Sequence, residues 1–396
     1  MKGEKVRVLH VITRLIRGGA DENTVFTVEG VDRSRYESEI LAGCRSETEG
    51  FSPYIQERTS LLPELVRDPN PIKDVIALFK MVRIIKRGRY DIVHTHTAKA
   101  GFLGRLAARM AGVPHVVHTV HGVTFHEHVN PLLRRLYVLL EKVGARCCEV
   151  MITVGEDVKR KYLEEAIGRR DQYVTIASGM DLTPFDSARV APADGRETLR
   201  RQLGFGPDDV VVGVVSRLEP RKGHRFLIEA ISRLAPDFPQ LKVLAVGEGP
   251  HKSELIEMVR RAGVERRFTF AGYRSDIAPV ISTFDIAMLT SLWEGLPRVL
   301  VQYSMLEKPI ITFEVEGARE IVDDGRSGWI VPPKDVDALV DRLRRLTLSA
   351  ADREAFGRRA RQRVERRWNV DLMVERISHL YDDVEAGRPA GEHTPV

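Results

Sequence analysis

The stretch DIVHTHTAKAGFLGRLAARMAGVPHVVHTV, residues 91–120, contains a pattern that recurs along the whole chain. Its two ends, residues 91–95 and 116–120, are short, apolar and rich in β-branched side chains, and residues 98–111 between them have a helical pattern. Apolar runs without alternation indicate strands that are buried on both faces, as in parallel sheets. The stretch therefore predicts a βαβ unit with a right-handed crossover.

The same order of apolar runs and helical segments continues on both sides of this stretch. In the first half, the apolar runs are residues 6–12, 38–42, 91–95, 116–120, 150–154 and 173–177. In the second half, they are residues 210–216, 241–246, 268–271, 284–290 and 309–313. Residues 187–209 contain Pro, Gly and charged residues and indicate a boundary. We predict an α/β protein of two Rossmann-like domains, residues 1–187 and 188–370.

The composition is that of a soluble globular protein. Of the 396 residues, 43% are hydrophobic and 30% are charged, which excludes a mainly disordered chain. No run approaches the roughly 18 uncharged apolar residues that a membrane-spanning helix needs. The first residues lack a signal-peptide pattern and there are three cysteines, so we expect a cytoplasmic protein. The net charge of +5 favours anionic partners such as phosphates, and no nucleic-acid-binding motif is present.

Residues that directly follow the apolar runs are the candidates for a binding site. Ligands of open parallel sheets bind beyond the carboxyl ends of the strands, and a cleft between two such sheets is the default site. Gly18 and Gly19 follow the first run, and Gly247 and Gly249 follow the run at 241–246. Glycines let a ligand approach the backbone closely, although ordinary turns explain them as well. The spacing is not GxGxxG and does not support a dinucleotide cofactor.

Two further strand-to-helix junctions carry charged side chains. Arg217 and Lys222 follow the run at 210–216, where they can neutralise a diphosphate or form an ordinary surface turn. Glu294 follows the run at 284–290; it can accept hydrogen bonds from sugar hydroxyls or simply favour the start of a helix. The backbone after it can hold a phosphate or sugar oxygen through its amides, with the exception of the proline. These residues are Gly295, Leu296, Pro297, Arg298 and Val299.

Histidines are concentrated in the first half of the chain. The histidines in question are His94, His96, His115, His118, His121, His126 and His128. His94 and His96 share a strand face, as metal ligands can, but no carboxylate or cysteine nearby completes a set. We therefore expect no metal site and interpret most of them as packed core residues. His121 directly follows the run at 116–120 and is the best candidate for contact with a reacting group.

The order of these motifs resembles that of the retaining glycosyltransferases of the family 4 (group 1) type. Gly-Gly, His-Gly and Arg-x4-Lys are followed by Gly-x-Gly-Pro, SLWEGLP and GAREIVDDGRSGWIVPP, which ends at residue 333. The resemblance implies the GT-B fold, with the helix at residues 371–386 crossing back to the first domain. It also implies transfer of a sugar from a nucleotide-diphosphate sugar, most often a UDP-sugar, without a metal or another cofactor.

The resemblance implies a role for each motif. His121 would hydrogen-bond the transferred sugar, and Glu294 would contact the sugar hydroxyls. Arg217 and Lys222 would bind the diphosphate and stabilise the leaving group. The glycine motifs and the backbone of residues 295–299 would help to hold the donor. Retention would follow from attack on the front face, with the departing phosphate taking the proton of the acceptor.

One position departs from the family pattern. The family has a second glutamate eight residues after the first, where it binds the nucleotide ribose, and this chain has Gln302 there. A glutamine accepts one hydroxyl hydrogen bond but lacks the charge, a loss of about 1 kcal/mol. We expect nucleotide binding to survive. The alternatives are a non-catalytic protein that binds nucleotide sugars and an NDP-sugar 2-epimerase.

The acceptor-binding residues are the least defined part of the sequence. Lys99, His96 and Arg105 are candidates, and residues 130–146, NPLLRRLYVLLEKVGAR, are amphipathic and basic. Such a segment suits a phosphate-bearing lipid and peripheral contact with the inner membrane face. It also suits an ordinary sheet-covering helix with a solvated cationic face. A polyprenyl-diphosphate-linked sugar, used in cell-surface polysaccharide or glycolipid synthesis, is our leading acceptor, with a soluble sugar as the alternative.

Overall fold

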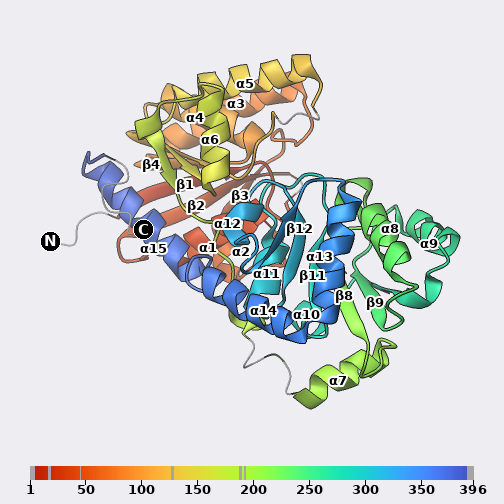
Figure 1. The fold of residues 1–396 in the computed structure, drawn as a ribbon. Helices are drawn as coiled ribbons and strands as arrows, with labels where there is room; N and C mark the ends of the chain where they lie inside the picture. The colour runs from red at the N-terminus through yellow and green to blue at the C-terminus, as the bar shows by residue number, and fades with distance from the viewer. Residues whose placement is uncertain are drawn as a thin grey trace. The chain divides into compact units, whose positions relative to one another are not determined.

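The computed structural model describes residues 5–16, 19–44, 46–125, 129–186, 190 and 193–389. The chain forms two compact units (Figure 1): one contains the residues up to Met180 and those from Asn369 onward, and the other contains Asp181–Trp368. The boundary expected between residues 187 and 188 falls outside the described residues. Among the helices of the described ranges, none has the length and apolarity needed to cross a bilayer.

The first unit is built on a parallel sheet of seven strands in the order β3-β2-β1-β4-β5-β6-β7. Its strands are β1 (Val6–Ile12), β2 (Tyr36–Gly43), β3 (Thr59–Leu62), β4 (Ile92–His96), β5 (His115–Val120), β6 (Val150–Thr153) and β7 (Tyr173–Thr175). Its α-helices are α1 (Gly19–Gly30), α2 (Pro53–Glu57), α3 (Pro71–Gly88), α4 (Ala98–Ala111), α5 (Pro131–Ala145), α6 (Glu156–Glu164) and α15 (Val370–Glu385). The strand order reverses between β1 and β4, which is where open α/β sheets bind their ligands.

Alternate residues of the first sheet pack against different helices. Val8 and Ile92 pack in one cluster with Ile377 of α15. Leu9 and Val93 pack in another cluster with side chains of α3 and α4. Figure 1 shows α3, α4 and α5 together on one side of this unit. Burial on both faces explains why the strands are apolar throughout rather than alternating.

The second unit is built on a parallel sheet of six strands in the order β10-β9-β8-β11-β12-β13. Its strands are β8 (Val210–Val215), β9 (Leu241–Val246), β10 (Phe268–Gly272), β11 (Ile286–Leu289), β12 (Ile310–Phe313) and β13 (Gly328–Val331). Its α-helices are α7 (Ala193–Gln202), α8 (His224–Leu234), α9 (Lys252–Arg261), α10 (Ile277–Ser282), α11 (Arg298–Met305), α12 (Ala318–Ile321), α13 (Val336–Leu348) and α14 (Ala350–Val364). Two parallel-sheet α/β units confirm the predicted fold class.

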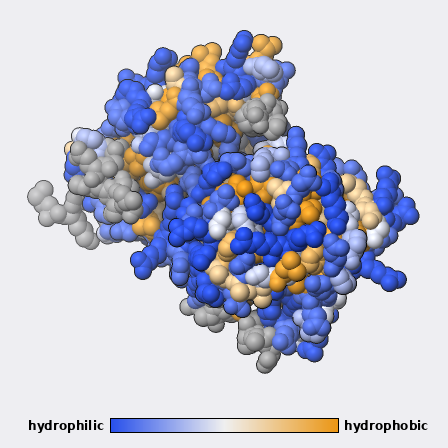
Figure 2. All heavy atoms as spheres, in the orientation of Figure 1, coloured by the Kyte–Doolittle hydropathy of each residue, from blue (hydrophilic) through white to orange (hydrophobic). Residues whose placement is uncertain are grey.

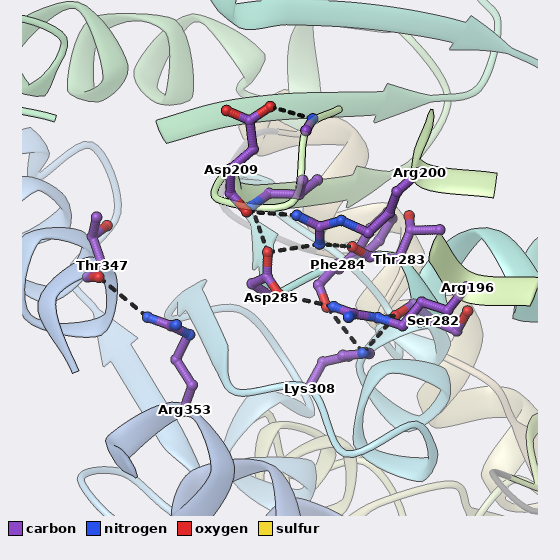
Figure 3. Close-up of polar contacts among 12 residues, drawn as sticks. Arg196, Arg200, Asp209, Ser282, Thr283, Phe284, Asp285, Lys308, Thr347 and Arg353 are labelled. Atoms are coloured by element: carbon purple, nitrogen blue, oxygen red, sulfur yellow. Dashed lines mark hydrogen bonds and ion pairs between the residues drawn. The ribbon is translucent and has the colours of Figure 1, made fainter. Parts of the chain in front are cut away.

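Helix α7 lies within the segment that the composition indicates as a boundary. Figure 3 shows how it is fixed: Arg196 and Arg200 form ion pairs with Asp285, at 2.8 and 2.9 Å. Asp285 also accepts a hydrogen bond from the Val211 amide at 2.8 Å. One carboxylate thus joins α7 to the first residues of β8 and to the segment before β11. The polar sequence of α7 is therefore a structural part of the second unit.

Candidate active site

The loops that follow β8 and β11 meet at the carboxyl edge of the second sheet, because these two strands are neighbours. The Leu292 amide donates to the Arg221 carbonyl at 2.8 Å, and Thr290 Oγ1 donates to the Lys222 carbonyl at 3.1 Å. Both loops carry charged residues that the sequence singles out. These two hydrogen bonds hold the loop with Arg217 and Lys222 against the loop with Glu294.

Lys222 and Glu294 form an ion pair in this place. Lys222 Nζ contacts Glu294 Oε1, and both side chains are largely buried. Arg221 Nη1 lies 3.5 Å from the other carboxylate oxygen of Glu294. The group presents two cations and one hydrogen-bond acceptor at the end of a strand. It can bind a diphosphate through the cations and a sugar hydroxyl through the carboxylate.

Arg217 lies apart from this ion pair. Its side chain is 72% exposed, and its Nε lies 3.0 Å from Glu219 Oε1. The other oxygen of Glu219 lies 3.1 Å from Arg221 Nε. The structure therefore adds Arg221 and Glu219 to the group of charges. The sequence signal for Arg221 was its place beside Lys222 in SRLEPRKG; nothing in the pattern distinguishes Glu219.

Gly247 and Gly249 allow two loops of the second unit to pack closely. Gly247 has φ 134°, and a Cβ there would lie 2.0 Å from the Ser216 carbonyl oxygen. A Cβ at Gly249 would lie 2.3 Å from the carbonyl oxygen of Leu218. The loop after β9 is thereby held against the loop after β8. Close packing of backbone explains both glycines, and it also shapes the edge of the sheet at which Lys222 lies.

Helix α11 begins at the predicted donor-binding backbone. Its N-cap residue is Pro297, and no side-chain hydrogen bond caps it within the described structure. The Arg298 amide donates to the Leu296 carbonyl at 2.9 Å and is thus used in the turn. Gln302 is partly buried and lies one turn into the helix. The helix start, close in sequence to Glu294, has the polarity that attracts anions.

In the first unit, His121 is the end of a chain of three imidazole rings. His121 Nε2 lies 3.3 Å from Nδ1 of His96, and His96 Nε2 lies 3.0 Å from Nδ1 of His10. The three residues belong to or follow β5, β4 and β1, which are adjacent in the sheet. Nothing in the sequence pattern distinguishes His10, which lies in the middle of an apolar run.

Burial keeps four histidines of strands β1, β4 and β5 neutral. It lowers the pKa of His10 to about 3, and it lowers the pKa values of His94, His96 and His118 well below their ordinary value. A neutral imidazole donates from one nitrogen and accepts at the other, so protons along the chain point in one direction. His10 Nε2 is buried and has no partner among the described residues, and a proton there would be an orphaned donor. The favoured arrangement has His10 donating to His96, and His96 donating to Nε2 of His121.

His10, His94 and His96 also lie close enough to hold a metal ion, with ligand atoms within 4.8 Å of one another. However, both nitrogens of His94 are engaged: Nδ1 with the Tyr381 hydroxyl at 2.6 Å, and Nε2 with the Thr119 hydroxyl at 2.7 Å. Zinc sites generally use at least three protein ligands. A hydrogen-bonded network therefore accounts for the cluster better than a metal site. That the reaction needs no metal stays a prediction.

A cavity of about 280 Å³ in the first unit is lined by residues that include His121, Gly122, Thr97 and Ala98. Thr97 precedes α4 with φ 61° and ψ 166°, a conformation that normally only glycine adopts. Its hydroxyl is held by Thr13 Oγ1 at 2.8 Å. Backbone strain of this kind concentrates at functional sites. The strain at Thr97 thus favours the cavity beside His121 as a binding site.

The three acceptor candidates are engaged within the first unit. Lys99 pairs with Asp74 at 2.7 Å, and His96 is buried in the imidazole chain. Arg105 is fully buried and pairs with Glu141 at 2.8 Å, so it joins α4 to α5 and presents no atom to a ligand. Of the other candidates, Gly19 begins α1, and Gly18, His126 and His128 lie outside the described residues.

Known proteins resemble this chain over nearly its whole length. It is 28% identical over 386 residues to the UDP-Gal:alpha-D-GlcNAc-diphosphoundecaprenol alpha-1,3-galactosyltransferase of Escherichia coli, covering 96% of this chain and 97% of that protein. It is also 28% identical to the putative glycosyltransferase EpsD of Bacillus subtilis, covering 83% and 85% of the two chains. The crystal structure of Anabaena HepE in complex with UDP superposes with a TM-score of 0.80 at 22% identity, covering 96% of this chain and all of that one.

Family models match both halves of the chain. A model described as glycosyl transferase 4-like domain matches residues 3–179, and a model of glycosyl transferases group 1 matches residues 195–363. Together they span both sheets and nearly all the motifs discussed above. The predicted resemblance is confirmed: the chain belongs to the group 1 glycosyltransferases and has the GT-B fold.

Proposed function

We propose that the protein transfers a sugar from a UDP-sugar to a polyprenyl-diphosphate-linked sugar, with retention of the anomeric configuration and without a metal. The observation that carries the proposal is the Lys222–Glu294 pair at the carboxyl end of β8 and β11, close to the uncapped start of α11. The E. coli relative is named for a UDP-Gal donor and a diphosphoundecaprenol-linked acceptor. HepE has been crystallised with UDP and with UDP-glucose. Transfer of a sugar to such an acceptor would take place at the inner membrane face, as a step of cell-surface polysaccharide or glycolipid synthesis.

The proposed mechanism relies on charge stabilisation and positioning. Negative charge builds on the diphosphate as its bond to the sugar breaks, and Lys222 stabilises this charge at the site where the bond is cleaved. Glu294 accepts hydrogen bonds from the sugar hydroxyls, and His121 hydrogen-bonds the transferred sugar. The departing phosphate takes the proton of the acceptor hydroxyl, which attacks on the same face. The cations do the work for which other enzymes use a metal ion.

Two arginines compete for the second diphosphate contact. Arg217 is the residue that the family resemblance implies, whereas Arg221 already lies 3.5 Å from Glu294. Because Arg217 is exposed, its side chain is free to rotate toward a bound diphosphate. We retain Arg217 as the proposed ligand and use Arg221 as the comparison. Arg217→Ala should then lower the rate of transfer more than Arg221→Ala does; the opposite order would reassign the role.

The proposed function is tested by product analysis in the presence of EDTA. The purified chain is incubated with UDP-sugars and a polyprenyl-diphosphate-linked sugar, and the anomeric configuration of the product is read by NMR. An α-linked product from an α-UDP-sugar is expected. An inverted product would refute retention, and loss of activity in EDTA would refute metal independence.

Nucleotide preference is measured by thermal unfolding with UDP, GDP or ADP in EDTA. A ligand at 100 times its Kd stabilises the folded protein by about 2.7 kcal/mol, which raises the Tm by a few degrees. We expect this increase with UDP. If none of the three nucleotides raises the Tm, the donor-binding assignment fails and a non-catalytic role takes its place.

A further inference from the structure

Four histidine side chains gather on one face of the first sheet. Side chains of a strand alternate between its two faces, so His94 and His96 of β4 share a face. His10 of β1 is the register partner of His94. Thr119 of β5 is the register partner of His96, and His121 follows Thr119 by two residues. The register of β1, β4 and β5 therefore brings the four imidazole rings together.

The volume of these side chains does not explain why histidine occupies the positions. Figure 2 shows hydrophilic residues over most of the visible surface, where water satisfies their hydrogen bonds. His10 and His96 are instead 0% and 2% exposed, and Val8, two residues before His10, packs in an apolar cluster with side chains of α15. A buried polar group costs free energy unless it is hydrogen-bonded, so an apolar side chain would fill the same space at lower cost. The ring nitrogens are therefore the feature that needs an explanation.

The hydrogen bonds between three of the rings have one favoured direction. His10 Nε2 is buried without a partner among the described residues, so its proton lies on Nδ1 and is donated to His96 Nε2 at 3.0 Å. His96 then carries its own proton on Nδ1, which lies 3.3 Å from His121 Nε2. For His96 to donate, His121 Nε2 must offer a lone pair. The proton of His121 is thereby placed on Nδ1.

We propose that His10 and His96 are positioning residues that fix the tautomer of His121, so that His121 presents the N–H of Nδ1 to the transferred sugar. The contact with the sugar rests on the proposed function, whereas the tautomer rests on hydrogen bonds within the first unit alone. An N–H donor at Nδ1 can bind a hydroxyl, a ring oxygen or an ether oxygen, because each of them accepts. In the other tautomer, Nδ1 would need a hydroxyl that donates. The two buried histidines thus determine which oxygens of the sugar His121 binds.

The tautomer is measured by NMR of the full-length chain with histidine labelled with nitrogen-15. Spectra that correlate the ring protons with both ring nitrogens distinguish a protonated nitrogen from an unprotonated one, and the signals missing from His121→Leu assign those of His121. We expect wild-type His121 to be protonated on Nδ1. In His96→Leu, which removes the donor, His121 should change to the Nε2–H form that free histidine favours in water. In His96→Asn, whose amide keeps a donor near the position of Nδ1, the Nδ1–H form should persist.

His94→Leu is the matched control, because His94 is equally buried beside His96 but bonds to other groups. The centroids of these two rings lie 4.2 Å apart, and the His94 nitrogens lie 2.6 and 2.7 Å from the hydroxyls of Tyr381 and Thr119. His121 in this variant should keep the wild-type tautomer. If His94→Leu changes the tautomer as His96→Leu does, packing of the rings sets it and the proposal is wrong. Wild-type His121 protonated on Nε2 would overturn the proposal even if no variant folds, and far-UV circular dichroism verifies the fold of each variant.

The positioning role is measured by the rate of sugar transfer from a UDP-sugar. His96→Leu should lower kcat/KM roughly tenfold, as loss of one well-directed hydrogen bond does, and His96→Asn should restore most of it. Because His96 acts through His121, adding His96→Leu to His121→Leu should lower the rate no further, whereas two independent defects would multiply. A further loss in the double variant, or a fully active His121→Leu, would overturn the positioning role. A wild type that transfers no sugar would refute the proposed function and the positioning role with it, whereas the tautomer is tested by NMR alone.

Discussion

Acid should destabilise the first unit through the buried imidazole of His10. Burial lowers the pKa of His10 to about 3, whereas the same group in the unfolded chain has a pKa near 6.5. Below pH 6.5 the unfolded chain therefore binds a proton that the folded chain does not. His10 has its full stabilising effect above pH 6.5, and that effect is lost as the pH falls toward 3.

The size of the effect follows from the two pKa values. Between pH 7 and pH 5, a group with a pKa near 6.5 unfolded and about 3 folded lowers the free energy of unfolding by about 2 kcal/mol. His94, His96 and His118 act in the same direction, because burial lowers their pKa values too. Since a domain has a total stability of about 5–15 kcal/mol, the cluster makes the first unit markedly acid-sensitive.

The assay compares the wild type with His10→Asn by urea unfolding at pH 7 and pH 5. Asparagine keeps a polar group near the position of Nδ1 but does not titrate. Far-UV circular dichroism follows both units, while tryptophan fluorescence follows the second unit alone, because Trp293, Trp329 and Trp368 all belong to it. Between pH 7 and pH 5, the free energy of unfolding of the first unit should fall by about 2 kcal/mol less in His10→Asn than in the wild type. This difference should appear in the transition that circular dichroism reports and tryptophan fluorescence does not.

The comparison concerns the loss on acidification and not the absolute stability, so any cavity that the variant creates cancels. His379→Gln is the matched control, because its side chain is 58% exposed on α15 and should leave the loss unchanged. An equal loss in the wild type and in His10→Asn would refute the reasoning. It would mean that His10 gains its proton without unfolding.

Three substitutions test the other parts of the structure. Lys222→Met should lower kcat by about 10²–10³-fold, as loss of one charge-stabilising group does, while the same change at the exposed Lys252 should leave the rate of sugar transfer unaffected. Gln302→Glu should tighten UDP binding or leave it unchanged in calorimetric titration; weakening by more than tenfold would remove Gln302 from the ribose site. Arg105→Met should lower the free energy of urea unfolding by about 3–5 kcal/mol because it leaves Glu141 buried without a partner, and adding Glu141→Gln should restore most of the loss.

The central strands of both sheets were predictable because burial on two faces demands continuous apolar runs. Two of the four edge strands were not. Thr59–Leu62 and Gly328–Val331 form β3 and β13, which each lie at one end of a sheet and are paired on one side only. The other two edge strands, β7 and β10, coincide with the predicted runs at 173–177 and 268–271. Two residues in the middle of β3 are exposed, so its sequence shows no clear apolar run. Short strands of this kind are defined by the neighbour with which they pair, and a local pattern does not contain that neighbour.

Helix α7 illustrates a second limit. Its residues are mostly polar, and the same composition is typical of a linker. What fixes the helix is Asp285, which lies 89 residues after Arg196 and 85 residues after Arg200 in the sequence. An ion pair between residues so far apart in the sequence cannot be predicted from a local pattern, because it forms only where the sheet brings the start of β11 beside the start of β8. The charged residues of α7 are therefore structural, although composition alone favours a solvated segment.

Lys222 and Arg105 show the same difference between what a local pattern contains and what only the folded chain shows. Lys222 and Glu294 each follow a strand, and strand ends gather at one edge of a parallel sheet, so sequence position alone places them together. Arg105 lies in the middle of α4, and its guanidinium fills the space that a Cβ at Gly144 would occupy, 2.6 Å away. That space and the carboxylate of Glu141 come from another helix, and no local pattern indicates which residues of α5 face α4. Positions relative to strand ends are thus recoverable from sequence, whereas a cation within a helix acquires its role only from the residue packed against it.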